Sequence, residues 1–223
     1  SLRPSLDPAQ ARPAAPVCGV QVSVLEPSPM TLPIFVSFWT NEAYSAHASK
    51  LAASLKNLQL EFDMIALPDL GDWQANVKHK PRFMIDMLTK HKRPVCWVDA
   101  DAVVLRGPEA LRGLGRFADI ASCKLERPGR GSERLGGTLW AAPTVAGCWF
   151  LEEWDRRCKT ETVWDQRILG DMIDGLGADT TGVRHVELPP AYCYIFDITK
   201  QLHPDVEPVI EHHQASRQLR KDR

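Results

Sequence analysis

The chain has 223 residues, and 44% of them are hydrophobic, which is enough apolar surface for one substantial core. Because 27 Lys and Arg residues stand against 28 Asp and Glu residues, the formal net charge is -1, and this balance excludes recruitment of nucleic acid or an anionic membrane through overall charge. No apolar run approaches the roughly 18 residues that a membrane span requires, so we expect a soluble protein without a membrane span.

The six cysteines are scattered along the chain, and none of them forms a C-x-x-C pair or a Cys/His cluster with the spacing of a zinc site. Cys96, Cys148 and Cys193 lie among apolar neighbours, as buried thiols of a reducing compartment do. We therefore expect a cytoplasmic protein.

The N-terminal segment is rich in proline, since seven of the 17 prolines fall within residues 1–33. Proline removes backbone donors and fixes φ, so residues 1–32 are predicted to form an extended arm. One edge strand is expected within it, at Val17–Leu25, where valines alternate with other residues. Residues 33–223 are predicted to form a single domain.

From Pro33 onward, strands and helices alternate. The predicted strands are Ile34–Trp39, Glu61–Leu67 and Pro94–Val98, with one helix after a cap at Asn41 and another at Pro81–His91. This order indicates an α/β fold with a mainly parallel sheet that is flanked by helices on both faces.

The second half of the chain continues with two strands on either side of a basic segment. Its predicted elements are strands Phe117–Ser122 and Gly136–Ala142, helices Val145–Arg157 and Trp164–Gly175, a proline-bounded segment Leu188–Phe196 and a last strand Pro208–His212. The polar segment Lys124–Arg134 is predicted to be a mobile loop.

An Asp-x-Asp motif, Asp99 and Asp101, follows the apolar strand directly. A strand that is apolar on both faces lies inside a parallel sheet, and ligands bind at the carboxyl ends of such strands. The chain is apolar again at Val103–Leu105, so an unpaired acid pair here would be costly. Carboxylates at i and i+2 can bind one hard divalent cation that also holds a diphosphate. We therefore predict a metal-binding pair.

The segment Val95–Val104 resembles the first motif of haloacid-dehalogenase-type phosphatases, an apolar run followed by Asp-x-Asp-x-Val. This resemblance implies Asp99 as the phosphoryl-accepting nucleophile and Asp101 as the general acid. Phosphate would be held by Ser122 or Lys124, and Gly170–Asp174 would complete the metal site. Two strand-and-helix units precede the motif, however, and no long apolar strand leads into the second acid pair.

The resemblance to GT-A (Rossmann-like) nucleotide-sugar glycosyltransferases covers more of the chain, from Pro33 to Lys221, and its motifs occur in the expected order. Several residues match the nucleotide-sugar contacts of this family. Thr40 and Asn41 follow the first strand, Lys80 or Arg82 lies on the helix before the acid pair, and Asp99 is the first acid of that pair. Gly136 and Gly137 match an Asn-x-Gly motif whose Asn is absent here, and Arg217 and Lys221 match the contacts to the phosphates.

The same resemblance implies catalytic and metal-binding residues. Asp165 would bind hydroxyls of the donor sugar, and Gln166 would lie near the anomeric carbon. Asp99, Asp101 and His212 would bind Mn2+ or Mg2+, with His213 in the aromatic position that follows the ligand.

The implied function is a metal-dependent glycosyltransferase with one GT-A-like catalytic domain. It would move a sugar from a nucleotide-diphosphate donor, with a UDP-sugar favoured, and the Asp-Gln pair resembles that of retaining enzymes. The acceptor is open among a glycan, a protein and modified DNA. Two alternatives remain at this point, the phosphatase and a catalytically inactive nucleotide-binding module.

Overall fold

The computed structural model describes residues 31–129, 131–176 and 182–219. The predicted edge strand at Val17–Leu25 and nearly all of the predicted arm lie outside these residues. In the part of the chain that is described, no helix is both long and apolar enough to cross a bilayer.

The centre of the molecule is a six-stranded sheet with the order β2-β1-β3-β6-β5-β7. Its strands are β1 (Ile34–Trp39), β2 (Phe62–Ala66), β3 (Val95–Val98), β5 (Ile120–Arg127), β6 (Gly131–Ala141) and β7 (His185–Leu188). Five strands run in one direction, and β6 alone runs against its neighbours β3 and β5. The prediction of a mainly parallel sheet is therefore confirmed.

Two hydrophobic cores lie on the two faces of this sheet, because successive side chains of a strand point to opposite faces. In β1, Ile34, Val36 and Phe38 belong to one core, and Phe35 belongs to the other. β3 divides in the same way, with Trp97 in the first core and Cys96 in the second. Both faces must therefore be covered, as the apolar strands predicted.

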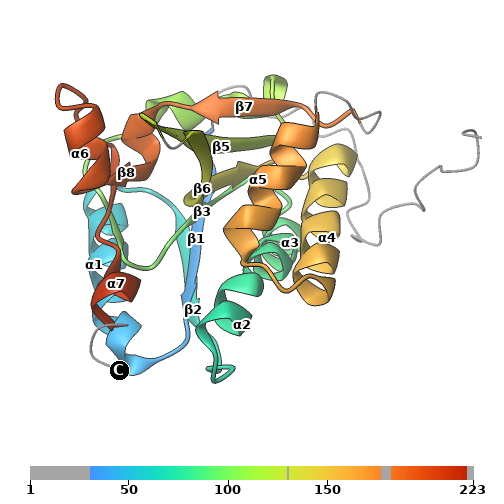
Figure 1. The fold of residues 1–223 in the computed structure, drawn as a ribbon, viewed down its shortest axis with the longest axis horizontal. Coiled ribbons are helices and arrows are strands. Elements are labelled where there is room, and N and C mark those ends of the chain that lie inside the picture. Colours follow the sequence, from blue (N-terminus) through green and yellow to red (C-terminus); the bar gives the residue numbers. More distant parts are fainter. Residues whose placement is uncertain (1–30, 130, 177–181, 220–223) are drawn as a thin grey trace, which may run out of the picture.

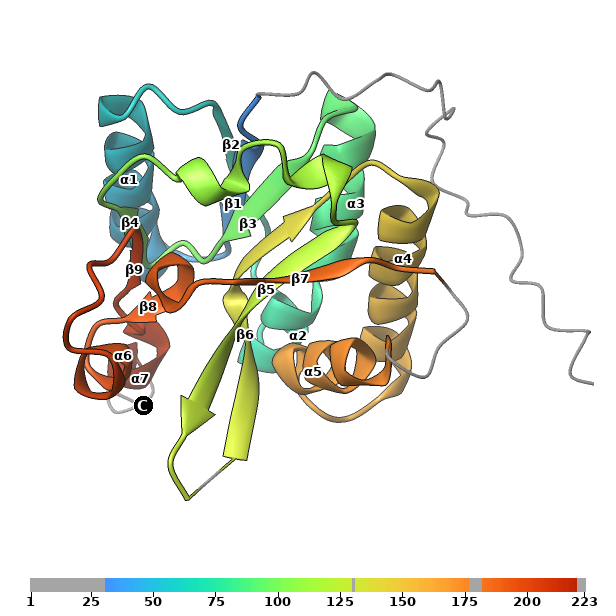
Figure 2. The ribbon, with the colours of Figure 1, turned by 90° about the horizontal axis from the view of Figure 1, so that it is seen from above.

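Helices cover the first face, and one helix with a smaller sheet covers the second (Figures 1 and 2). On the first face lie α2 (Trp73–Lys78), α3 (Lys80–His91), α4 (Val145–Thr160) and α5 (Asp165–Gly175). On the second lie α1 (Glu42–Asn57), the short strands β4 (Ala102–Val104), β8 (Tyr194–Ile195) and β9 (Ile210–His212), and the short helices α6 (Ile198–Leu202) and α7 (Ala215–Leu219). The elements α2, β4, β7, β8, α6 and α7 were not predicted from the sequence.

The predicted loop at Lys124–Arg134 was wrong, because β5 and β6 form a hairpin through this segment. Antiparallel pairing continues as far as Arg127 opposite Gly131. Leu125 and Leu135 of this hairpin are buried in the second core, so the apolar alternation of both strands continues into a segment whose many charges suggested a loop. Gly131 has a φ of 79°, a left-handed conformation that glycine adopts without strain at the turn.

The smaller sheet has the order β4-β9-β8 and joins distant parts of the chain. β4 begins directly after Asp101 and pairs antiparallel with β9, so that Ala102 lies opposite His212. This register brings the last strand to the carboxyl end of β3, where the Asp-x-Asp motif emerges.

Candidate functional site

Asp99 is the first residue beyond β3, and its position is fixed by the main sheet. Its backbone N–H donates to the carbonyl of Gly137 on β6 at 2.9 Å. Its carboxylate accepts a hydrogen bond from the indole Nε1 of Trp97 at 2.8 Å. The side chain remains 36% exposed, so it can meet a ligand from the solvent side.

Asp101 is buried and is held by the segment that follows β9. Its Oδ2 accepts from the backbone N–H of Ala215 at 2.7 Å, and its backbone carbonyl accepts from the N–H of His213 at 3.2 Å. Burial and the neighbouring charge of Asp99 raise the pKa of Asp101 above its ordinary value. Within the described residues no Lys or Arg pairs with this carboxylate.

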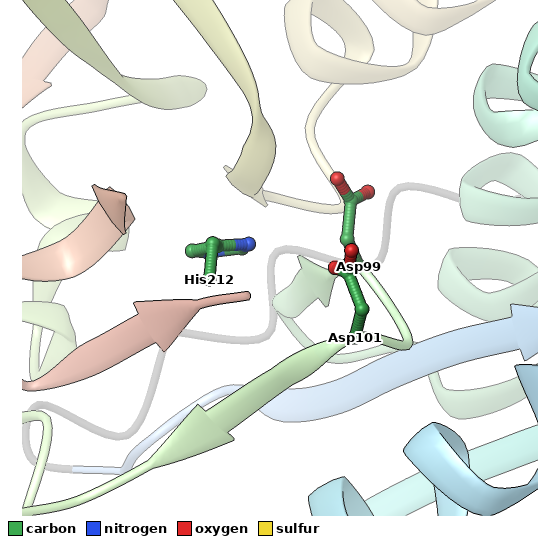
Figure 3. A group of neighbouring side chains, drawn as sticks. All are labelled: Asp99, Asp101 and His212. Carbon is green, nitrogen blue, oxygen red and sulfur yellow. The ribbon is translucent and has the colours of Figure 1, made fainter. Parts of the chain in front are cut away.

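His212 completes a cluster with the two aspartates. One ligand atom each from Asp99, Asp101 and His212 lies within 4.8 Å of the others, and Figure 3 shows His212 approaching the two aspartates from β9. The Nε2 of His212 lies 2.9 Å from the hydroxyl of Thr138, whereas its buried Nδ1 has no hydrogen-bond partner among the described atoms. Two carboxylates and an imidazole form a donor set that suits a divalent cation such as Mn2+ or Mg2+.

The surroundings of this cluster favour positive charge. Burial alone would lower the pKa of His212, but Cys193 and the two carboxylates raise it to about 9.

The imidazole of His212 also needs the absence of a side chain at position 137. A β-carbon on Gly137 would lie only 2.9 Å from His212 Cε1 and 3.1 Å from Cys193 Sγ. Gly137 therefore makes room for the imidazole.

Lys80 joins the Asp-x-Asp motif to the predicted catalytic pair. Its Nζ lies 3.2 Å from Asp99 Oδ1, 3.3 Å from Asp165 Oδ2 and 2.9 Å from the carbonyl oxygen of Gly136. Burial would lower the pKa of Lys80, but the two carboxylates raise it above its usual value, so the ammonium group stays charged. Arg82, which was the alternative to Lys80 as the basic nucleotide-sugar contact on this helix, is exposed and pairs with Asp86 at 2.6 Å.

Asp165 and Gln166 begin α5 next to Lys80. Burial raises the pKa of Asp165, and the charge of Lys80 opposes that shift. The Oε1 of Gln166 accepts from the backbone N–H of Gly136 at 3.0 Å, and its Nε2 donates to Glu133 Oε1 at 2.6 Å. Glu133 was not predicted to be a site residue.

A cavity of about 410 Å³, a size typical of small-molecule sites, adjoins these residues, and the buried His212 and the exposed Arg82 are not part of its lining. The predicted residues in its lining are Thr40, Asn41, Lys80, Asp99, Asp101, Gly137, Asp165, Gln166 and Arg217. Gly136 contacts the site through its backbone, and Lys221 lies outside the described residues. The lining also includes residues that were not predicted to belong to the site, among them Tyr44, Asp69, Trp73, Glu133 and Trp164.

The residues that a phosphatase would need do not converge on this cavity. The hydroxyl of Ser122 is bonded to His185 Nε2 at 2.9 Å, and Lys124 pairs with Glu126 at 2.5 Å. Asp171 and Asp174 of α5 pair with arginines away from the lining. The phosphatase interpretation therefore has no site in the described structure.

No protein-family model and no curated protein sequence matches this chain. Among solved structures, it is similar to a glycosyltransferase involved in the glycosylation of the major capsid of PBCV-1. The two sequences are 11% identical, the match covers 86% of this chain and 99% of that chain, and the TM-score is 0.64. The apo form of the glycosyltransferase GlyE of Streptococcus pneumoniae TIGR4 is 16% identical. That match covers 81% of this chain and 54% of GlyE, with a TM-score of 0.52.

The apo structure of the bifunctional glycosyltransferase WbbM is 14% identical, with 83% of this chain and 46% of that chain covered and a TM-score of 0.53. The present chain thus spans about half the length of GlyE and WbbM and nearly all of the PBCV-1 enzyme. These similarities show the fold, and the chain has a GT-A-like glycosyltransferase fold.

Proposed function

We propose that this protein is a glycosyltransferase that moves a sugar from a nucleotide-diphosphate donor, a UDP-sugar in the favoured case, with the help of Mn2+ or Mg2+. The observation that carries the proposal is the cluster of Asp99, Asp101 and the buried His212, whose two aspartates line one cavity of a glycosyltransferase fold. Lys80 and the Asp165-Gln166 pair line the same cavity.

The charge of the cavity supports the need for a divalent cation. Six carboxylates line it, against three cationic side chains, Lys80, Arg127 and Arg217. All three cations already have partners: Lys80 in Asp99 and Asp165, Arg127 in Glu133 at 3.0 Å, and Arg217 in Asp197 at 2.7 Å. A diphosphate would therefore meet an excess of negative charge, unless Asp99, Asp101 and His212 held a cation that neutralises the leaving diphosphate.

The protein's own side chains would orient the donor. Lys80 lies between the carboxylates of Asp99 and Asp165 and pairs with both. It would therefore keep the metal ligand Asp99 and the sugar-binding Asp165 at a constant distance from each other. We assign Asp165 to hydroxyls of the donor sugar and Gln166 to the neighbourhood of the anomeric carbon, with retention of configuration. Thr40, Asn41 and Arg217 would contact the nucleotide.

The acceptor is not identified, and its candidate classes are those named above, a glycan, a protein and modified DNA. A catalytically inactive module would bind the donor equally well but would not turn it over. We also propose a cytoplasmic location, because the five cysteines in the described residues are buried thiols, which fits a reducing compartment.

A thermal-shift matrix tests the proposal. Nucleoside diphosphates are added with and without MnCl2 to the wild type, to Asp101→Ala and to a matched control, Asp86→Ala, whose exposed carboxylate lies outside the cavity. A ligand at 100 times its Kd stabilises by about 2.7 kcal/mol, which raises the melting temperature of a chain of this size by about 5–10 °C.

We expect this shift for UDP with Mn2+ in the wild type and in Asp86→Ala, and its loss in Asp101→Ala. Release of free sugar or transfer from UDP-sugar then separates an enzyme from an inactive module. The proposal fails if no nucleoside diphosphate produces a metal-dependent shift, or if Asp101→Ala responds as the wild type does.

A further inference from the structure

The amide of Gln166 is fixed at both ends by the β5–β6 hairpin. Its Oε1 accepts from the N–H of Gly136 at 3.0 Å, and its Nε2 donates to Glu133 Oε1 at 2.6 Å. Both partners lie on β6, three residues apart, whereas Gln166 belongs to the first turn of α5. The hairpin therefore sets the orientation of a side chain on a different element.

The two contacts permit one orientation of the amide only. If the amide were reversed, its NH2 group would face the N–H of Gly136 and its oxygen would face a carboxylate oxygen of Glu133. Both contacts would then be repulsive, so the backbone donor and the carboxylate select the same arrangement. The short distance to Glu133 is typical of a hydrogen bond to a charged acceptor.

Glu133 is itself held in place by Arg127. Arg127 Nη2 lies 3.0 Å from Glu133 Oε2, so one carboxylate oxygen faces the arginine and the other faces Gln166. Glu133 lies opposite Leu125 in the hairpin register, and Arg127 is two residues beyond Leu125 on the same face of β5. The ion pair offsets the charge of Glu133 in a cavity that is already acidic.

We infer that Glu133 is a positioning residue, which acts through Gln166 and presents one remaining amide N–H to the sugar of the donor. A primary amide has two N–H groups, and Glu133 occupies one of them. Gln166 lines the cavity, so the second N–H is available to an oxygen of the bound sugar. This inference rests on the proposed function, and it adds a residue that determines how the sugar, and not the nucleotide, is held.

Calorimetric titration with two matched ligands tests this role. UDP is compared with UDP-glucose, UDP-galactose and UDP-N-acetylglucosamine in MnCl2, and the sugar that adds most to wild-type affinity is used for the variants. These are Glu133→Ala, Glu133→Gln, Gln166→Ala and the double variant Glu133→Ala/Gln166→Ala. The control is Glu126→Ala, which removes a carboxylate from the same hairpin outside the cavity.

We expect Glu133→Ala to keep its affinity for UDP within about twofold and to lose about tenfold in affinity for the UDP-sugar, the equivalent of one hydrogen bond. Gln166→Ala should lose at least as much, and the double variant should be no weaker than Gln166→Ala alone, because Glu133 acts through Gln166. Glu133→Gln retains an acceptor oxygen and should recover most of the affinity. Glu126→Ala should bind both ligands as the wild type does.

An equal loss of affinity for UDP and UDP-sugar in Glu133→Ala would overturn the inference, since it would indicate a general effect on the fold. Additive losses in the double variant would overturn it as well, and so would a wild type that binds UDP but gains nothing from any of the sugars. A wild type that binds neither UDP nor any UDP-sugar would instead overturn the proposed function, and this inference with it.

Discussion

Replacement of Lys80 by methionine should destabilise the protein strongly, because it leaves a buried carboxylate without its counter-charge. Lys80 is 5% exposed and Asp165 is 3% exposed, and 3.3 Å separates their charged atoms. Removal of one partner from a buried ion pair typically costs about 3–5 kcal/mol. Asp99 is partly exposed and contributes less, because water screens its charge.

Urea denaturation in the presence of EDTA measures this cost without a metal ion that could compensate the charge. We expect Lys80→Met to lose about 3–5 kcal/mol of unfolding free energy. The double variant Lys80→Met/Asp165→Asn should recover a large part of that loss, because the uncompensated charge is gone. The control Lys50→Met changes an exposed lysine of α1 and should stay within about 0.5 kcal/mol of the wild type.

Either of two results would contradict an electrostatic role for Lys80. A Lys80→Met variant within about 1 kcal/mol of the wild type would mean that water reaches Asp165 freely. Additive effects in the double variant would mean that the loss arises from packing around the lysine stem and not from its charge.

Gly137 beside His212 and the ion pair of Asp119 with Arg184 provide two further tests. Gly137→Ala would place a methyl group 2.9 Å from His212 Cε1, so the imidazole would have to move. We expect the affinity for Mn2+ to fall at least about tenfold in a calorimetric titration. The control Gly175→Ala has open space around the new methyl group and should leave the affinity unchanged. Burial would raise the pKa of Asp119, but Arg184 and its backbone N–H lower it. A carboxyl group whose pKa is lowered in the folded state stabilises the fold at pH values above its ordinary pKa, and this stabilisation is lost as the pH falls. Arg184→Leu should therefore reduce the unfolding free energy at about pH 7. In urea titrations, the difference from the wild type should shrink below about pH 4.

Much of the fold could be predicted because strand and helix periodicities are local properties of the sequence. The alternating first half and the buried strand before Asp99 needed no knowledge of tertiary contacts. The hairpin at Lys124–Arg134 was missed because its charges outweighed the alternation of Cys123 and Leu125, both of which are buried. That alternation was the signal that would have extended β5.

The choice between Lys80 and Arg82 shows a similar missed signal. Lys80 lies on the same helical stripe as Met84 and Met87, which are buried, whereas Arg82 is two residues away on the exposed side. Helical spacing therefore favours Lys80. Glu133 had no comparable signal, because its role depends on β6 lying beside the first turn of α5, a contact between elements that no local pattern encodes.

The pairing of β4 with β9 also has a consequence for the order in which the site is completed during synthesis. Asp101 and its backbone donor Ala215 are 114 residues apart, and His212 arrives with the same late segment. A growing chain that has formed the whole central sheet has Asp99 in place, but it still lacks His212 and the backbone amide that holds Asp101. Such an intermediate cannot bring the three candidate ligands together, so the cation site that we propose would be completed only when the last strand is added.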